Sequence, residues 1–203
     1  MDAYRNFAEL CKSEEEGVDF RILIAKRQAS ATVILAPHGG AIEPGTSEVA
    51  MAVAGDDLSL ALFEGIKPGG GNRRLHLTST LFDEPRCVEL VQGADAVVAI
   101  HGEASAKPSV YLGGRDHILG AQLETALKRN GYVVEIHGNM NLHGLSMKNI
   151  CNRGRGGEGV QLELSRGLRR TFFRALTDEG RKEPTDEFFR FTAAVRQVLL
   201  SHK

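Results

Sequence analysis

Residues 31–50 read ATVILAPHGGAIEPGTSEVA, and this stretch decides the fold class. It begins with an apolar run that ends at Ala36, continues through a loop with His38, two glycines and Glu43, and enters a segment of helical character near Thr46. Short runs that are apolar throughout are typical of strands buried on both faces of a sheet. The stretch therefore predicts a strand, a tight loop and a helix in succession.

The same alternation continues on both sides of this stretch. Further predicted strands, rich in Val, Ile and Leu, occupy residues 20–27, 57–63, 94–100, 132–136 and 159–164. Predicted helices occupy residues 3–16, 46–55, 83–93, 115–131 and 184–203, and the acidic end of the first is expected to be solvated. Basic residues and Gly131 end the fourth helix, and Thr185 is placed to cap the fifth. Strands that alternate with helices predict an α/β sandwich around a largely parallel or mixed sheet.

Length and composition predict a globular chain with a single domain over residues 1–203. The chain is 42% hydrophobic and 25% charged, with a formal charge of −1, and no apolar run approaches the ~20 residues that cross a bilayer. Disorder and a membrane partner are therefore not expected. The first residues lack the features of a signal peptide, which predicts a cytoplasmic protein. The three cysteines share no CxxC spacing, so any metal is expected to be held by His and carboxylate.

Positive charge is concentrated in residues 145–174, although the whole chain is nearly neutral. This stretch holds two acidic and seven basic residues, the latter being Lys148, Arg153, Arg155, Arg166, Arg169, Arg170 and Arg174. Such a local excess can attract an anionic ligand. The last three arginines are expected to lie on a solvated surface. No aromatic-interleaved basic stripe accompanies them, so nucleic acid is not an expected partner.

Two histidines follow apolar runs in the same way. His38 and Glu43 lie in the loop after the first run, and His101 follows the run at residues 94–100. Ligands bind beside the carboxyl ends of strands in open α/β sheets, because the loops diverge there. Imidazole and carboxylate are normal zinc ligands, and the neighbouring glycines let the backbone turn tightly. We therefore predict a zinc site made of His38, Glu43 and His101, with a fourth position open to water as in catalytic sites.

Glu163 is the candidate general base. Apolar residues surround it in the run at residues 159–164, where burial would raise its pKa toward useful basicity. The alternative is an alternating strand that exposes Gln161 and Glu163 on one solvent face. His137 and His143, which each precede a glycine, are the alternative third metal ligand.

Three more residues are candidates for substrate contact. The loop GRGGEG at residues 154–159 matches GxGxxG, but a strand follows it rather than a helix, which argues against a dinucleotide site. We interpret it as a loop that places Asn152 and Arg153 beside the strand of Glu163, where a guanidinium suits a substrate carboxylate. The alternative for Arg153 is a surface ion pair. His76 flanks a Ser/Thr-rich turn and could contact substrate or support a metal ligand.

Several segments resemble the poly-γ-glutamate hydrolase family of bacteria and their phages. They are PHGGAIEPGTSEVA, LHLTSTLFDEP, the strand ending IHG, YLGGRD and NICNRGRGGEGVQLELS, in this order between Ala31 and Ser165. The resemblance implies a zinc-dependent hydrolase with a three-layer α/β/α sandwich, a mixed, largely parallel sheet and a fold similar to that of metallocarboxypeptidases.

The resemblance also implies the site and its reaction. By position, it assigns zinc binding to His38, Glu43 and His101 and the role of base to Glu163. Four residues separate His38 from Glu43, whereas the carboxypeptidase pattern has two, so only the closer family supports this pairing. The implied reaction is hydrolysis of γ-glutamyl bonds in an anionic, peptide-like substrate. A zinc deacylase of small N-acyl amino acids and a non-catalytic anion-binding module are the alternatives, and the sequence leaves open the natural substrate, the oligomeric state and internal or terminal cleavage.

Overall fold

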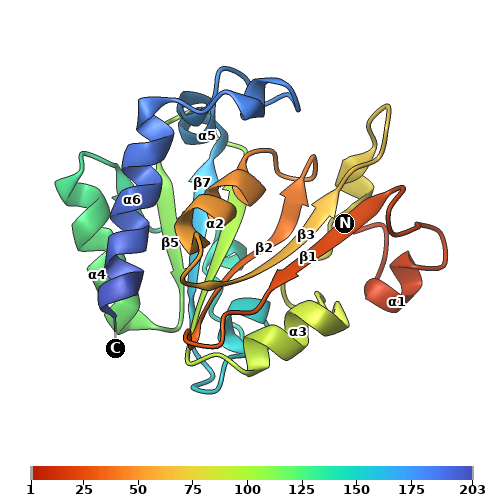
Figure 1. Cartoon of the computed structure of the whole chain (residues 1–203), viewed down its shortest axis with the longest axis horizontal. Helices are drawn as coiled ribbons and strands as arrows, with labels where there is room; N and C mark the ends of the chain where they lie inside the picture. The colour runs from red at the N-terminus through yellow and green to blue at the C-terminus, as the bar shows by residue number, and fades with distance from the viewer. Residues whose placement is uncertain (1, 203) are drawn as a thin grey trace.

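A mixed seven-stranded sheet forms the centre of the computed structural model, which describes residues 2–202 (Figure 1). The strand order is β1-β3-β2-β4-β7-β5-β6. The strands are β1 (Phe20–Ala25), β2 (Thr32–Gly40), β3 (Ser59–Gly65), β4 (Ala96–Glu103), β5 (Val110–Gly114), β6 (Val134–Glu135) and β7 (Val160–Ser165). Strands β3, β2, β4 and β7 are parallel to one another, whereas β1 and β5 are antiparallel to their partners β3 and β7. The prediction of a mixed, largely parallel sheet is confirmed.

Helices cover both faces of the sheet and complete three layers. They are α1 (Phe7–Leu10), α2 (Thr46–Ala54), α3 (Pro85–Gln92), α4 (His117–Arg129), α5 (Arg166–Phe172) and α6 (Asp186–Ser201), with short 3-10 turns η1 (Asn72–Leu75), η2 (Met140–Leu142), η3 (Ile150–Asn152) and η4 (Gly180–Lys182). One hydrophobic core lies between the sheet and α2, α4, α5 and α6, and a second lies between the sheet and α1 and α3. Figure 1 shows α2, α4 and α6 on one side of the sheet and α1 and α3 on the other.

The central strands are apolar because both of their faces are covered. Every residue of β2, β3 and β7 is buried. Within β2, Ile34 and Ala36 pack into the first core, and Val33 and Leu35 pack into the second. Successive strand residues point to opposite faces, so a strand between two cores has no polar alternation.

Helix boundaries follow the predicted capping signals. The helix α4 ends in Lys128 and Arg129, and Gly131 beyond it has a φ of 87°. Thr185 caps α6, because its side chain accepts a hydrogen bond from the backbone N–H of Phe188. Both signals were correctly placed, since they depend on local backbone geometry alone.

Other elements differ from the sequence expectation. The predicted helix at residues 3–16 is only the single turn α1, and its acidic end is solvated at Glu15 and Glu16, whereas Glu14 is buried and pairs with Lys67 and Tyr4. The predicted strand at residues 132–136 shortens to β6. The glycine-rich strand β5 and the arginine-rich helix α5 were not predicted, because neither contains a run of apolar residues long enough to signal an element.

Within residues 2–202, no helix combines the length and the apolar character that a membrane span requires.

Candidate metal centre and cleft

The candidate site lies where β2, β4 and β7 end side by side. The pairing of β2 with β3 shifts register between Ala36 and Gly39, and His38 lies within this irregularity. The chain then turns back, so that the N–H of Glu43 donates to the carbonyl of His38 at 3.0 Å. Gly40 permits the turn, because its φ is 63° and an added Cβ would be 2.5 Å from the carbonyl oxygen of Gly65. The loop therefore brings Glu43 back over the end of β2.

Three predicted ligands meet at this edge of the sheet. The Nδ1 atoms of His38 and His101 are 3.1 Å apart. Glu43 Oε1 lies 3.2 Å from Nδ1 of His38, and Glu43 Oε2 lies 3.8 Å from Nδ1 of His101. An ion bound tetrahedrally at about 2.0–2.2 Å separates its ligand atoms by roughly 3.3–3.6 Å. The three separations are near these values, with Glu43 facing the two histidines through different carboxylate oxygens.

Hydrogen bonds on the outer side fix the orientation of these groups. Nε2 of His38 donates to the carbonyl oxygen of Leu77 at 2.7 Å, so Nδ1 faces Glu43 and His101 and is the nitrogen that a metal ion would bind. The backbone N–H of Gly102 donates to Glu43 Oε2 at 2.7 Å. Nε2 of His101 lies 3.5 Å from Ser79 Oγ. The unused nitrogens point away from the centre, as they do in histidines that bind metals.

His76 lies beside the same centre. Its ring stacks on that of His38 with centroids 3.9 Å apart, and its Nε2 lies 3.9 Å from Glu43 Oε1. Among residues 2–202, His38, Glu43 and His76 form the group that offers one ligand atom each within 4.8 Å of one another, whereas Glu43 faces His38 and His101 with different oxygens. Nδ1 of His76 is held by the carboxylate of Asp2 at 2.8 Å. No sequence pattern points to Asp2, which is separated from His76 by more than seventy residues.

Burial and neighbouring charges displace the pKa values of the cluster. Burial alone raises the pKa of Glu43, but the two histidines reverse this effect and lower it to about 2. Burial also lowers the pKa of His38, but Glu43 raises it above the ordinary value. The pKa of His101 is lowered to about 3 by burial and by His38. The cluster therefore combines an ionised carboxylate with a neutral imidazole, which suits a cation.

Glu163 lies next to this cluster on β7, where its backbone is opposite that of His101 on β4. Gln161 and Glu163 are 3% and 5% exposed, so they do not form a solvent face of the strand. Gln161 Nε2 donates to Glu163 Oε1 at 2.8 Å. Burial and the charge of Glu43 raise the pKa of Glu163 to about 8. A carboxyl group with this pKa is poised to exchange protons near neutral pH.

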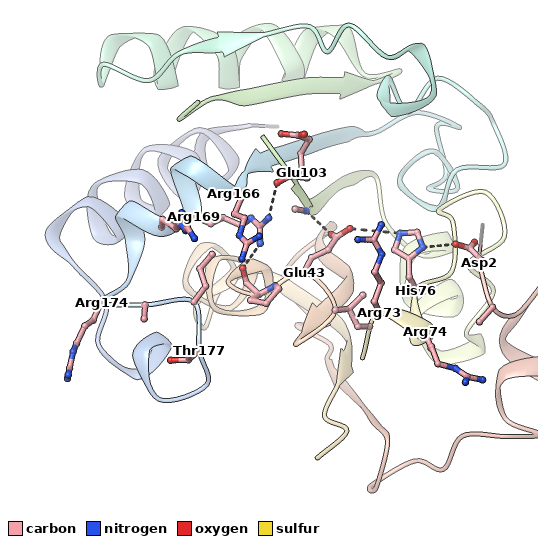
Figure 2. A pocket seen from close by; sticks show the side chains of 18 residues that line it. Asp2, Glu43, Arg73, Arg74, His76, Glu103, Arg166, Arg169, Arg174 and Thr177 are labelled. Atoms are coloured by element: carbon pink, nitrogen blue, oxygen red, sulfur yellow. Dashed lines mark hydrogen bonds and ion pairs between the residues drawn. The ribbon is translucent and has the colours of Figure 1, made fainter. Parts of the chain in front are cut away.

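A cavity of about 1180 Å³ opens over Glu43 and His76. Arginines form much of its wall, and they come from both sides: Figure 2 shows Arg73 beside His76 and Arg166 and Arg174 beyond Glu43. Among residues 2–202, no carboxylate lies within ion-pair distance of Arg73, Arg166 or Arg170. These side chains leave the cavity with free positive charge.

Two of the predicted substrate-binding residues lie elsewhere. The guanidinium of Arg153 donates to the carbonyl oxygens of Lys148, Phe82 and Thr80, and neither Arg153 nor Asn152 lines the cavity over Glu43. These contacts are neither the predicted carboxylate clamp nor the alternative surface ion pair. The side-chain amide of Asn152 donates to the carbonyls of residues 144 and 146 and holds its own loop.

The alternative metal ligands have other contacts. Nε2 of His143 donates to the carbonyl of His137 at 2.6 Å. His137 packs edge-on against Tyr111, and its Nε2 is 4.0 Å from Glu103 Oε1. His143 is thus held within its own loop, and His137 faces residues of β4 and β5.

Arg169 was expected on a solvated surface, and that expectation is wrong. The side chain is buried, with Nε donating to the carbonyl of Leu164, Nη1 to that of Pro44 and Nη2 to that of Glu103. Burial lowers its pKa, and a guanidinium remains charged nonetheless. The basic composition of residues 145–174 predicts a positively charged region, but it does not predict that one of its arginines, Arg169, is buried.

The fold and site define an α/β protein with a candidate metal centre at the floor of an arginine-lined cavity. The chain matches the family model described as poly-gamma-glutamate hydrolase over residues 4–194, and it belongs to that family. It is 36% identical to UPF0714 protein YndL of Bacillus subtilis (strain 168), over 98% of this chain and 78% of YndL. The family and the fold class predicted from the sequence are confirmed.

Two solved structures are similar over nearly their whole length. A bacteriophage poly-gamma-glutamate hydrolase superposes with a TM-score of 0.92 at 33% identity, with 98% of this chain and 96% of that chain covered. Zinc-free apo YndL superposes with a TM-score of 0.92 at 34% identity, with 99% and 98% covered. Because the chain belongs to the poly-gamma-glutamate hydrolase family, it is a member of a hydrolase family.

Proposed function

We propose that this chain is a zinc-dependent hydrolase that cleaves γ-glutamyl amide bonds with water. The observation that carries the proposal is the meeting of the two Nδ1 atoms of His38 and His101 with the Glu43 carboxylate, beside the buried Glu163. The poly-gamma-glutamate hydrolase family supports the choice of bond, and the zinc-free state of solved YndL supports the choice of metal.

His38, Glu43 and His101 are the residues that would hold the ion. Two neutral imidazoles and one carboxylate fit zinc, and they leave a fourth position for water. We place His76 outside the ligand set, because its ring stacks on that of His38 with the planes 30° apart and its Nδ1 is held by Asp2. We assign His76, held by Asp2, to contact with substrate at the cavity wall. Zinc, when bound, would polarise the scissile carbonyl and make its water more acidic.

Glu163 carries the proton in this proposal. Its carboxylate accepts a proton from the attacking water and then donates it to the leaving nitrogen, so that the amine departs neutral. The Gln161 amide orients Glu163 by donating to one of its oxygens, which leaves the other oxygen for the water. A raised pKa serves both halves of the cycle, because the group must gain and lose the same proton.

The cavity fits an anionic chain better than a small acylated amino acid. Its volume of about 1180 Å³ exceeds the ~300–1,000 Å³ of usual small-molecule pockets. A γ-linked glutamate chain carries one free carboxylate per residue, and the unpaired guanidinium groups of Arg73, Arg166 and Arg170 are suited to bind such groups. These arginines take the role that the sequence had suggested for Arg153.

The test is digestion of poly-γ-glutamate beside a panel of N-acyl amino acids, with and without a chelator. We expect shortened polymer, a smaller rate on the panel and loss of both after chelation. His38→Ala should lose stoichiometric zinc and activity. His117→Ala is the matched control, since His117 is exposed at the start of α4 and should retain both.

Each alternative has its own result. A deacylase would process the small panel and leave the polymer intact. A non-catalytic module would bind the polymer without turnover and without dependence on chelator. A His38→Ala variant with full zinc content would exclude the proposed ligand set.

A further inference from the structure

One buried guanidinium contacts all three segments that carry the candidate site. Arg169 on α5 donates from Nη1 to the carbonyl of Pro44 at 2.6 Å, from Nη2 to that of Glu103 at 2.9 Å and from Nε to that of Leu164 at 3.0 Å. Pro44 directly follows Glu43, and Leu164 directly follows Glu163. The remaining carbonyl, that of Glu103, lies two residues beyond His101 on β4.

These segments are far apart in sequence, and only part of their relative position is fixed by the sheet. Strands β4 and β7 are hydrogen-bonded neighbours, but Glu43 lies in the loop after β2, outside any ladder. The Arg169 fork therefore joins this loop to the two strands. A planar guanidinium with five N–H donors fixes several acceptors in one geometry, which a lysine ammonium cannot do.

The backbone around Arg169 is shaped to receive it. A Cβ added at Gly102 would lie 2.7 Å from Arg169 Cζ and 2.9 Å from Glu43 Cβ. The N–H of the same Gly102 donates to Glu43 Oε2. The absent side chain at residue 102 thus lets the guanidinium and the Glu43 loop approach the end of β4 together.

Within the described residues, Arg169 makes no direct ion pair that would account for its burial. Among residues 2–202, no acidic oxygen lies within ion-pair distance of its guanidinium, and all three of its side-chain hydrogen bonds go to backbone carbonyls. The charges of Glu43, Glu103 and Glu163 act on it only from beyond ion-pair distance, and a buried charge with no direct ion pair is costly to keep for stability alone. The burial of Arg169 is explained by the three backbone carbonyls that its guanidinium binds.

We propose that Arg169 is a positioning residue that sets the distance of Glu43 from His101 and of Glu163 from both. The inference rests on the proposed function, because it assigns Arg169 to the geometry of that metal centre. Arg169 also lines the cavity, but in this proposal it acts through the backbone of its neighbours. Loss of the fork should loosen the Glu43 loop and weaken zinc binding.

The experiment measures zinc affinity by competition with a chromophoric chelator, together with kcat and KM, on folded protein. Arg169→Lys keeps the charge and loses the fork, and Arg169→Gln loses the charge and keeps a planar amide donor. We expect at least tenfold weaker zinc binding in both variants, in the range of about 10–100-fold seen when supporting contacts of metal ligands are removed. We also expect a lower kcat with KM within twofold of wild type.

The matched control is Arg196→Lys. Arg196 on α6 also donates to backbone carbonyls, those of Val53 and Ala54, but it lies at the end of α2 away from the site. Its substitution should lower the melting temperature and leave zinc affinity unchanged. This pattern separates positioning from a general loss of stability.

Three outcomes would overturn the proposal. Unchanged zinc affinity in Arg169→Lys and Arg169→Gln would reduce Arg169 to a structural role. A raised KM with unchanged zinc affinity would make it a substrate contact, and normal affinity in Arg169→Lys alone would show that charge suffices. Wild-type protein that binds no zinc would instead overturn the proposed function, and this inference with it. If Arg169→Lys does not accumulate as folded protein, Arg169→Gln decides by the same measurements.

Discussion

Glu163 is a carboxyl group that burial and the Glu43 charge keep protonated well above its ordinary pKa of 4.5, up to a pKa of about 8. The folded, zinc-free protein therefore binds a proton between these two values that the unfolded chain has released. Stability falls with rising pH wherever the native state binds the extra proton. The proposed catalytic carboxylate should thus destabilise the metal-free fold at the pH where it works.

The first prediction follows from this linkage. Relative to Glu163→Gln, zinc-free wild-type protein should lose stability between pH 5 and pH 8, on the order of a few kcal/mol, because each unit of raised pKa is worth about 1.4 kcal/mol. Glu163→Gln removes the titrating group, so this part of the loss should disappear. Urea unfolding at several pH values measures it. Glu158→Gln, at an exposed position, should behave like wild type; equal pH slopes in wild type and Glu163→Gln would contradict the assignment.

A second prediction concerns turnover. In zinc-loaded protein, Glu163→Gln should lower kcat by about 10²–10⁴-fold, the usual contribution of a general base. Zinc content should stay at one per chain, since Glu163 is not among the proposed ligands. Metal analysis and polymer digestion on the same sample measure both quantities. Full activity in the variant would exclude Glu163 as the base, and loss of zinc would make it a ligand.

At the scale of single residues, the sequence predicts the position of a side chain well when that side chain lies at the end of a predicted strand. The positions of His38, His101 and Glu163 are set by parallel neighbours of one sheet, so the apolar runs that predict the strands also predict their proximity. Arg153 and Arg169 show the limit. Which arginine is buried, and which carbonyls it meets, depends on loops that come together only after folding.

At the scale of the element, the segment from β2 to α2 determines where Glu43 lies relative to the strand ends. Its loop carries Glu43 over the end of β2, and Thr46 begins the helix after Gly45 at a φ of 101°. The sequence predicted this strand, loop and helix because the apolar run and the glycines occur together. It did not predict α5, which has seven residues and packs through Leu168 and Phe172 alone on its apolar side.

The third prediction tests the turn at Gly40. Gly40→Ala should destabilise the protein by at least about 1–3 kcal/mol, since a non-glycine residue at positive φ carries that cost, and the added Cβ also meets the carbonyl of Gly65 at 2.5 Å. Gly69→Ala separates the two effects, because Gly69 has a φ of 78° with no atom near its Cβ. Gly138→Ala, with open space and an ordinary backbone, should be close to neutral.

Chemical denaturation of the three glycine variants gives the comparison. The expected order of loss is Gly40→Ala, then Gly69→Ala, then Gly138→Ala. The Gly40 variant should also bind zinc more weakly, because the same turn places Glu43. A Gly40→Ala protein as stable as Gly138→Ala would contradict the close approach to β3.

At the scale of the whole molecule, a net charge of −1 conceals a strongly uneven distribution. Arginines from η1 and from α5, which lie almost one hundred residues apart in sequence, face the same cavity. The sequence predicted the basic stretch of residues 145–174 and an anionic ligand. It could not predict that Arg73 joins them, because η1 packs on β3 and shares a cavity with α5 only after the strands are ordered in the sheet.

The fourth prediction follows from this shared positive field. Replacing Arg73, Arg166 and Arg170 together by Gln should raise KM for poly-γ-glutamate at least tenfold at low salt, because the charges attract carboxylates across the open cavity. The same change should leave kcat within about threefold, because none of the three touches the candidate metal centre. Salt should raise KM in wild type and have less effect in the variant, since exposed charges are screened within about 8–10 Å at physiological ionic strength.

The matched control replaces three arginines that lie outside the cavity, Arg129, Arg155 and Arg190, and so changes the net charge equally. If net charge alone attracted the polymer, both triple variants would show the same KM. A small neutral amide substrate provides the second comparison, because its KM should not respond to either set. Steady-state rates at several salt concentrations therefore separate a local subsite from a general charge effect. Equal KM values for the two triple variants would rule out the arginine-lined cavity as the place where substrate carboxylates bind.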